Sequence, residues 1–522
     1  MGWRMGSAAF DIVQSFSSNR FFWRMVWLTL GVKLALAWLL PFTGDEAYFV
    51  VWGNNLDYGY YDHPGMTGWW IWVTLLIDQS PLIIRLPAIV GPILIALLMR
   101  GFLRRVDQKT ANLAAVLFLL SPLNVLNVLM TTDTPIFILS LISGWFVWRA
   151  ERGASKVNYL LAGLFLGAAF FSKYFAVLLG LSYAVYFLFR RRPNIAGLGL
   201  VFLGVIPWAT LNIVWLYHHC WTNIVFNIYN RNENTGFSLD GVGLLAASIV
   251  LLLGPGIVFF LLRRRSKADR RPWPEVWTRL RRRKLDLFAI CFVLPQLVFL
   301  LVSLSNTVGL HWLLSFYPFA FPVLAVVFGT AGLVRLVKWT GIYTFTLTLL
   351  IFTLLLVPRH WASFHDSYDS VAMGTRPDRV LEEMMDQAPG AFLATSSYAK
   401  SALLEFHARE HVLVVGPSYH HARQDDMVTD FRLLEGQSIA IVTADLEEEL
   451  FTFEPWFDEH RVELIEIEGA KFGIFIGEGF RYNDYRELVL RPVAENYYTL
   501  PDWLKRFSGS CYFCEKYDLC EE

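Results

Sequence analysis

Repeated apolar runs long enough to cross a lipid bilayer are the feature that most constrains this chain. A hydrocarbon core about 30 Å thick requires about 20 apolar residues in a helix. Of the 522 residues, 55% are hydrophobic and only 17% are charged, which disfavours a soluble fold of this size. We therefore predict a polytopic α-helical membrane protein with eleven spanning segments, at 22–41, 82–103, 110–129, 135–150, 158–172, 174–189, 195–216, 241–262, 285–304, 313–334 and 340–358.

Segments 158–172 and 174–189 are short, because each reaches only about 23 Å as a helix. We expect them to form a broken or deeply set hairpin. Since they come as a pair, the topology of the later segments does not depend on whether they span. The first segment has no small-x-small cleavage site, so we expect it to remain as an uncleaved anchor.

The distribution of basic residues predicts the orientation. One set of connections is rich in Lys and Arg, whereas the opposite set is nearly bare apart from Lys173 and Arg231. The positive-inside rule makes the rich set cytoplasmic, which places the N-terminus inside and residues 359–522 outside. The simplest reading of the run 263–284 is a topology anchor near anionic lipid head groups. The rich set also includes Arg20, Arg24, Arg100, Arg104, Arg105, Lys109, Arg152, Lys156, Arg190, Arg191, Arg192, Arg335 and Lys338.

Two domains are predicted, a membrane domain at 1–358 and a polar domain at 359–522. The polar part alternates short apolar runs with helical patterns, which favours a small α/β domain. Its helix is SYAKSALLEFHARE (397–410), and its strands are AFLATSS (391–397), HVLVVG, SIAIVTA, VELIEIE and KFGIFIGE. Near the C-terminus, the cluster Cys511, Cys514 and Cys520 favours one disulfide over a metal site, because three thiols do not complete a zinc site.

The first outer loop concentrates ionisable groups at the edge of the bilayer, where such groups are costly and usually serve function or pair with each other. These groups are Asp45, Glu46, Asp57, Asp62 and His63. The run GMTGWWIWVTLLI (65–77) that follows is rich in Trp and too short to span, so we expect a helix in the plane of the interface. The loop is then a lid or collar over a cavity.

Asp133 lies in a second outer connection, TTDTP, just before Pro135. Proline suits the first turn of a helix, so one reading makes Asp133 a helix cap. The other reading is convergence, because short loops at one face of a bundle can bring Asp45 and Asp133 to a shared cavity that a lipid head group enters from the membrane.

Isolated cations and histidines also lie along the predicted outer rim. Each alone is read as an interfacial anchor as readily as a functional group. Together with the acids they describe a cavity, and cations retained on this side suit an anionic ligand such as a phosphate. The set is Arg85, Lys173, His218, His219, Arg231, His311 and Trp312, with Glu233 beside Arg231.

Six motifs occur in order: GDEAYFVVW, GYYDHPG, IIRLPAIVG, SPLNVLNVLMTTDTP, LAGLFLGAAFFSKYFAVLL and GLHWLLSFYP. In this order the chain resembles the bacterial membrane glycosyltransferases of family 39, the protein-mannosyltransferase-like group, whose relatives include the aminoarabinose transferases that modify lipid A. The resemblance covers about the first 330 residues. The family often has a second proline in DHPP; Gly65 stands there in this chain and is expected to loosen the turn.

The resemblance implies a GT-C fold with an extracytoplasmic C-terminal α/β domain, in a bacterial inner membrane. It implies transfer of a hexosyl or pentosyl unit from a polyprenyl-phosphate donor to an envelope acceptor on the periplasmic face, as in lipopolysaccharide modification. The acceptor is lipid A, another glycolipid, a polysaccharide or a protein. Asp45 matches the catalytic acid, with Glu46 beside it, and Asp133 matches a second acid. Substrate-binding positions are Tyr61, Asp62, His63, Arg85, Lys173, Arg231 and His311.

The chemistry of this transfer agrees with the residue types. A carboxylate can take the proton of an acceptor hydroxyl as it attacks the anomeric carbon, and a single displacement inverts that carbon. The leaving phosphate is already anionic and needs cations rather than an acid. No soluble-type DxD pair indicates a nucleotide-linked donor, and no nucleic-acid partner is expected. A divalent metal ion on carboxylates with His63 or His311 stays open, since no ligand spacing compels it.

Two other classes of protein share features with this sequence. A multi-span transporter or lipid flippase with an outer ligand-binding domain fits the many spans, but transporters place charges near the midplane and often show inverted repeats. Here the acids cluster at the predicted outer rim, and no repeat is evident. A non-catalytic binding protein that recognises envelope polymers is the third class.

Overall fold

Two compact units make up the structure, a computed structural model. It describes residues 13–105, 107–190, 192–230, 236–237, 239–262, 273–356, 368–417, 423–445, 449–509 and 511–519. The first unit comprises Met1–Leu39, Asp78–Thr210 and Asn234–Leu355, and the second comprises Leu40–Ile77, Leu211–Glu233 and Leu356–Glu522. The C-terminal region thus forms one unit with the first outer loop and with the segment that follows residue 210.

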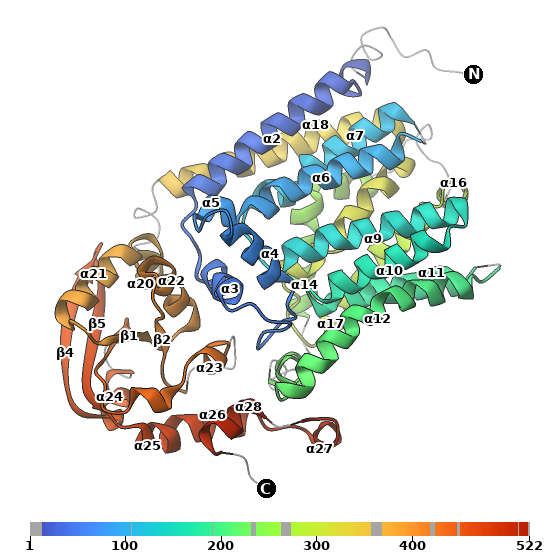
Figure 1. Ribbon diagram of the computed structural model, residues 1–522. Helices are drawn as coiled ribbons and strands as arrows, with labels where there is room; N and C mark the ends of the chain where they lie inside the picture. The colour runs from blue at the N-terminus through green and yellow to red at the C-terminus, as the bar shows by residue number, and fades with distance from the viewer. Residues whose placement is uncertain are drawn as a thin grey trace, which may run out of the picture. The chain divides into compact units, whose positions relative to one another are not determined.

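The first unit is helical (Figure 1). Helix α2 packs along α7, α6 along α7, and α9 along α10. Its helices are α2 (Asn19–Leu39), α5 (Pro81–Ile84), α6 (Leu86–Leu103), α7 (Gln108–Leu119), α8 (Pro122–Leu126), α9 (Asp133–Gly153), α10 (Lys156–Phe170), η1 (Tyr174–Ala176), α11 (Val177–Leu188), α12 (Ile195–His218, whose last residues belong to the second unit), α14 (Asp240–Leu253), α15 (Pro255–Leu262), α16 (Trp273–Arg283), α17 (Asp286–Val302), η4 (Leu310–Leu313), η5 (Tyr317–Phe319) and α18 (Ala320–Leu356).

Several of these helices are suited to a membrane. Among the described residues, four are long and apolar enough to cross one: Asn19–Leu39, Pro81–Leu103, Ile195–His218 and Tyr317–Leu356. Two bent pairs, α14 with α15 (102°) and α16 with α17 (117°), bring the number to six when each pair is one span. Shorter apolar helices at Lys156–Phe170 and Tyr174–Leu188 coincide with the two segments that were predicted to be short. The chain is thus a polytopic helical membrane protein, and the count of eleven spans stays a prediction.

Local sequence sets the α9–α10 hairpin and the packing of α10 on α12. Ala154 ends α9 in the left-handed conformation (φ 48°), and the Ser155 side chain caps α10 by accepting a hydrogen bond from the Asn158 amide at 3.4 Å. On α10, a side chain at Gly163 would collide with the Val201 carbonyl of α12. Small residues therefore let these two helices approach closely, as in other membrane bundles.

The last helix corrects one detail of the predicted topology. Arg335 and Lys338 were placed in a connection between two spans, but both lie within α18. The break falls earlier, at Gly329, whose φ of 62° and ψ of −175° are not helical. Glycine adopts positive φ without steric cost, which permits the break at Gly329, whereas Gly332 and Gly341, which flank Arg335 and Lys338, lie within the helix.

A five-stranded mixed sheet forms the centre of the second unit (Figure 1). The order is β2-β1-β3-β5-β4, with β1 parallel to both β2 and β3, and β5 antiparallel to β3 and β4. Every residue of β3 is buried. The strands are β1 (Phe392–Thr395), β2 (Leu413–Val414), β3 (Ile439–Thr443), β4 (Phe457–Ile467) and β5 (Ala470–Phe480), and all five coincide with the predicted strands.

Helices cover this sheet, and α22 coincides with the predicted amphipathic helix. The other helices of the unit are α3, α4, α13 and α20 to α28. Their bounds are α3 (Gly44–Asn54), α4 (Met66–Leu75), α13 (Thr222–Ile224), η2 (Val225–Tyr229), α20 (Tyr368–Thr375), α21 (Pro377–Gln387), α22 (Tyr398–Ala408), α23 (Asp425–Val428), η6 (Phe431–Leu434), α24 (Glu449–Phe453), η7 (Glu454–Trp456), α25 (Tyr482–Tyr485), η8 (Arg486–Leu490), α26 (Arg491–Tyr497), α27 (Asp502–Lys505) and α28 (Tyr512–Tyr517).

The first outer loop folds against the α/β part of its own unit. Helix α3 packs on α22, and a side chain at Gly44 would lie 2.7 Å from the Ala399 carbonyl oxygen. The rings of Phe42 and Phe406 are 4.2 Å apart. The run predicted to be an interfacial helix is indeed helical, as α4. The loop is therefore a packed element rather than an exposed tether.

A disulfide joins Cys220 to Cys511 across 291 residues of sequence. The prediction of a disulfide is confirmed for Cys511, but its partner was not expected. Sequence proximity favoured a bond inside the C-terminal cluster, whereas the fold brings the end of α12 beside Cys511, and the backbones of His219 and Cys511 form a β-bridge. Cys520 lies outside the described residues.

Candidate active site

The N-terminus of α3 explains the pair of acids in GDEAYFVVW. Thr43 caps the helix, and its hydroxyl accepts a hydrogen bond from the Glu46 amide at 3.3 Å. The Glu46 carboxylate reaches back to the Thr43 amide, also at 3.3 Å, which completes a capping box. Glu46 is fully buried. The structure therefore gives Glu46 a stabilising role at the start of α3.

Asp45 points the other way and is exposed. Its Oδ1 accepts a hydrogen bond from the Tyr398 hydroxyl of α22 at 3.1 Å. The protein around the carboxyl displaces hydration water, which raises the pKa of Asp45 above its usual value even though the residue as a whole stays exposed. The Tyr398 hydrogen bond lowers this pKa in part, and the nearby charges of Asp62 and Glu46 raise it. Asp45 is thus an accessible carboxylate with the environment of a general base.

The motif GYYDHPG folds into a tight turn. Gly59 and Pro64 form an antiparallel bridge, and the Tyr60 amide donates to the His63 carbonyl at 2.8 Å. Gly65, which was expected to loosen this turn, is closely surrounded by backbone. A side chain at Gly65 would lie 2.9 Å from the carbonyl oxygens of Asp57 and Tyr58, so the glycine permits close packing.

Asp62 and His63 form a pair at the end of this turn. The distance from His63 Nδ1 to Asp62 Oδ2 is 2.9 Å, and Asp62 is 8% exposed. The other oxygen, Oδ1, is buried and has no hydrogen-bond partner among the described residues. Since buried polar atoms are normally hydrogen-bonded, this oxygen could accept a hydrogen bond from a ligand. Tyr61, in contrast, is fully buried in the core of the unit, 5.8 Å from the ring of Phe226.

Asp57 is engaged in structural contacts. Its carboxylate accepts hydrogen bonds from the Tyr58 amide at 2.6 Å and from the Trp215 indole at 3.0 Å. His219 stacks on Trp215 with ring centres 4.2 Å apart. These contacts fasten the first outer loop to the end of α12 within the second unit.

In the first unit, Asp133 is the first residue of α9, and Thr132 rather than Asp133 occupies the cap position. The Lys173 amine lies 2.9 and 3.0 Å from the two carboxylate oxygens of Asp133. Asp133 is 3% exposed and Lys173 is 7% exposed. Asp133 therefore pairs with Lys173, a residue from the tip of the short hairpin, and this pairing was not predicted.

The tip of this hairpin also contacts the motif GLHWLLSFYP. Lys173 lies 5.6 Å from the centre of the Phe175 ring, and Phe175 lies 4.6 Å from the Trp312 ring. His311 is exposed beside Trp312. Arg85 is fully buried at the break between α5 and α6, where its Nη1 donates to the Ala37 carbonyl at 2.7 Å.

The predicted site residues thus fall into two groups. Asp45, Glu46, Tyr61, Asp62 and His63 belong to the second unit, and Arg85, Asp133, Lys173 and His311 belong to the first. Within each group the structure brings together the pairs given above. The meeting of Asp45 with Asp133 joins residues of different units and stays a prediction, and Arg231 and Glu233 lie outside the described residues.

Sequence reasoning missed Tyr398 and Lys33. Tyr398 is 353 residues from Asp45, so no local pattern links them. Lys33 did carry a signal, because it interrupts the apolar run of α2. It is buried, and its amine donates to the carbonyls of Asn124 and Asn127 at 2.6 and 2.7 Å, which satisfies the end of α8.

For a metal ion, the described residues offer no group of three or more His, Cys, Asp or Glu side chains arranged to hold one. His63 pairs with Asp62, with Nδ1 2.9 Å from Oδ2. The structure thus provides no ready three-ligand site within its described part.

Comparison with known proteins supports the resemblance seen in the motifs. Residues 62–218 match the family model described as dolichyl-phosphate-mannose-protein mannosyltransferase. This range includes Asp62, His63, Arg85, Asp133 and Lys173, and begins after Asp45. A search of the curated proteins finds no match.

The fold is similar to that of ArnT from Cupriavidus metallidurans, whose crystal structure was determined bound to undecaprenyl phosphate. The TM-score is 0.59 at 15% sequence identity, and the similarity covers 88% of this chain and 98% of that chain. The predicted resemblance to GT-C membrane glycosyltransferases related to ArnT is thereby confirmed, at the level of the fold and of the matched segment.

Proposed function

We propose that this chain is a membrane glycosyltransferase that moves one sugar from a polyprenyl-phosphate carrier to an envelope acceptor on the periplasmic face. The matched family segment and the shared fold support glycosyltransferase activity of this general kind. The observation that carries the proposal is the state of Asp45, an accessible carboxylate with a raised pKa, oriented by Tyr398.

Asp45 acts as the general base in this proposal. Its carboxylate accepts the proton of an acceptor hydroxyl while the oxygen forms a bond to the anomeric carbon. The bond from that carbon to the phosphate oxygen breaks, and its electron pair leaves with the lipid phosphate. One displacement inverts the anomeric configuration and yields a glycoside and a polyprenyl phosphate. An acceptor phosphate would attack without the base.

Lys173 is the proposed anchor for the lipid phosphate, and Asp133 positions it. A lysine ammonium has three N–H donors, and the two oxygens of Asp133 account for two of them. The third can donate to a phosphate oxygen, where a fixed positive charge stabilises the charge that grows on the leaving group. Arg85, Arg231 and His311 are further candidates for contact with the donor, and Asp62 with His63 for the sugar.

The wider setting completes the proposal. Residues 1–358 form the catalytic membrane domain, with eleven spans and a cytoplasmic N-terminus in a bacterial inner membrane, and residues 359–522 form the periplasmic domain. A polyprenyl tail keeps the donor in the bilayer, so its sugar is presented at the membrane surface. Lipid A, another glycolipid, a polysaccharide or a protein is the acceptor, as in lipopolysaccharide modification.

The test is transfer of a radiolabelled sugar from a polyprenyl-phosphate donor by purified protein in lipid nanodiscs. Envelope extract supplies the acceptors, and mass spectrometry of the labelled product identifies the sugar and the carrier. The proposal expects transfer to a hydroxyl acceptor that Asp45→Asn slows about 10²- to 10⁴-fold. Transport or flipping of the donor without formation of any glycoside would overturn it.

A further inference from the structure

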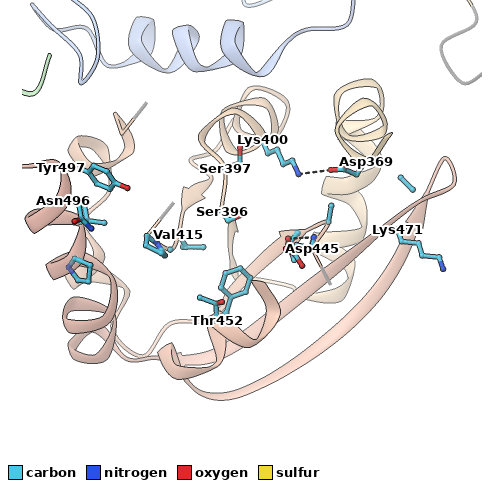
Figure 2. Close-up of a pocket in the computed structure, with 18 of the residues that line it drawn as sticks. Asp369, Ser396, Ser397, Lys400, Val415, Asp445, Thr452, Lys471, Asn496 and Tyr497 are labelled. Atoms are coloured by element: carbon cyan, nitrogen blue, oxygen red, sulfur yellow. Dashed lines mark hydrogen bonds and ion pairs between the residues drawn. The ribbon is translucent and has the colours of Figure 1, made fainter. Parts of the chain in front are cut away.

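A cavity of about 970 Å³ opens in the second unit at the carboxyl ends of the parallel strands (Figure 2). Ser396 and Ser397 follow β1, Val415 follows β2, and Thr443 and Asp445 lie at and beyond the end of β3; all five line it. The chain runs from β1 through α22 to β2 on one side, then returns to β3 on the other. This is a topological switch point, the place where open α/β sheets bind ligands.

The charges on the cavity wall are balanced. Two acids and two lysines line it, and the Lys400 amine lies 3.3 Å from an Asp369 oxygen. Asp445 and Lys471 are the second acid and lysine, and Figure 2 shows the Lys471 amine pointing away from the centre. A wall without excess charge does not attract a polyphosphate. The turn after β1, Thr395-Ser396-Ser397, also lacks the glycines that let a backbone approach a pyrophosphate.

Hydroxyl and amide groups dominate the rest of the polar lining. Ser396, Ser397, Thr443 and Thr452 contribute hydroxyls, and Asn496 contributes an amide. Hydroxyl and amide groups both donate and accept hydrogen bonds, which matches a ligand whose own groups do both. Pro417, Pro492 and the ring of Tyr497 supply accessible apolar surface between them. The volume lies near the upper end of the range for small-molecule sites, about 300–1,000 Å³.

We propose that this cavity binds a saccharide, with room for more than one ring. A sugar presents hydroxyls that donate and accept around its edge and C–H surface on its faces, and it carries no charge. The hydroxyl and amide groups of the wall match the sugar hydroxyls, its apolar residues match the C–H faces, and its balanced charges match the neutral ligand. A lipid chain would leave the hydroxyls unpaired, and a nucleotide would place phosphates where the charge is already balanced.

Helix α22 connects this cavity with the proposed base. Ser397 at its cap and Lys400 in its first turn line the cavity, while Tyr398 between them donates to Asp45. A saccharide in the cavity therefore contacts the same turn that orients Asp45. This role, acceptor recognition coupled to Asp45, rests on the proposed function; the binding itself does not.

Binding is tested without any transfer reaction. Full-length protein in nanodiscs is examined by saturation-transfer difference NMR with methyl α-mannopyranoside, N-acetylglucosamine, N,N′-diacetylchitobiose and maltotriose, and with methyl phosphate and AMP as anionic probes. We expect saturation transfer to at least one of the four saccharides and to neither anion. Saturation transfer to methyl phosphate or AMP alone, or to no probe at all, would overturn the proposal.

Variants locate the site. Asn496 and Thr452 are exposed, so Asn496→Leu and Thr452→Val should fold normally, which thermal unfolding verifies. Each should weaken saccharide binding about tenfold, as expected for the loss of one hydrogen bond to a ligand. Glu495→Leu, on the same helix but outside the cavity wall, is the matched control and should bind like the wild type. Unchanged binding in both cavity variants would place the sugar elsewhere. Because saccharide binding is measured without any donor lipid, a failed transfer assay would not imply failed binding.

Discussion

The Lys173 amine bridges both carboxylate oxygens of Asp133, at 2.9 and 3.0 Å, although the two residues belong to different hairpins and both are almost fully buried. Such a pair is costly to desolvate and persists only with good geometry. Loss of one partner leaves the other charge buried and unpaired, so substitution of either residue should lower the stability of the protein. Stability must therefore be measured alongside activity for every variant of this pair.

Removal of one partner should be far more harmful than removal of both charges. Lys173→Met leaves the Asp133 carboxylate buried without its cation, which we expect to cost about 3–5 kcal/mol of stability. The double variant Lys173→Met/Asp133→Asn removes both charges and should recover part of that loss. Thermal unfolding of the single and double variants in detergent gives the coupling energy. Strictly additive effects of the two substitutions would argue against the pair.

Asp45 and Glu46 are neighbours, but substitution of Asp45 should mainly lower the transfer rate, whereas substitution of Glu46 should mainly lower stability. Asp45→Asn should lower the transfer rate about 10²- to 10⁴-fold, the usual contribution of a general base, with a change in stability within about 0.5 kcal/mol. Glu46→Ala breaks the capping box and should cost about 1 kcal/mol or more in stability. Transfer kinetics and thermal unfolding of both variants check this. A wild-type rate in Asp45→Asn would remove the proposed base.

Tyr398 should set the pH dependence of transfer. A base works only when it is ionised, so the rate should rise with pH through the pKa of Asp45, which the protein raises. The Tyr398 hydrogen bond favours the ionised form and lowers that pKa in part. Tyr398→Phe removes it, so the acidic limb of the rate profile should move to higher pH.

The matched control for Tyr398→Phe is Tyr58→Phe, because Tyr58 is an exposed tyrosine of the first outer loop. Its pH profile should coincide with that of the wild type. An acidic limb in Tyr398→Phe that stays in place, or moves to lower pH, would show that the hydrogen bond does not act on the catalytic group.

Local pattern was enough to predict much of this fold. Apolar length located α2, α12 and the short hairpin helices, and short apolar runs located the five strands. These features depend on neighbours within one turn or one strand. The motif positions of Asp62, Arg85 and Lys173 were likewise readable in order along the chain.

Contacts between segments far apart in the chain could not be predicted from the sequence. The Asp45–Tyr398 hydrogen bond and the pairing of Asp133 with Lys173 depend on how helices pack, which no short window encodes. The break at Gly329 shows a further limit, because charge suggested a connection near Arg335 while backbone freedom decided where the helix bends.

The Cys220–Cys511 disulfide is the clearest of these long-range contacts and can be tested directly. It closes the chain across 291 residues and ties the end of α12 to the C-terminal helices of the same unit. Cys511→Ser should therefore cost about 2–4 kcal/mol in the stability of this unit. Cys514→Ser, three residues further along, is the matched control and should cost less. Peptide mapping without reductant should yield one cross-linked peptide that contains Cys220 and Cys511. A bond from Cys511 to Cys514 or Cys520 instead would refute the pairing, and the segment after residue 210 would then lose its covalent tie to the C-terminus.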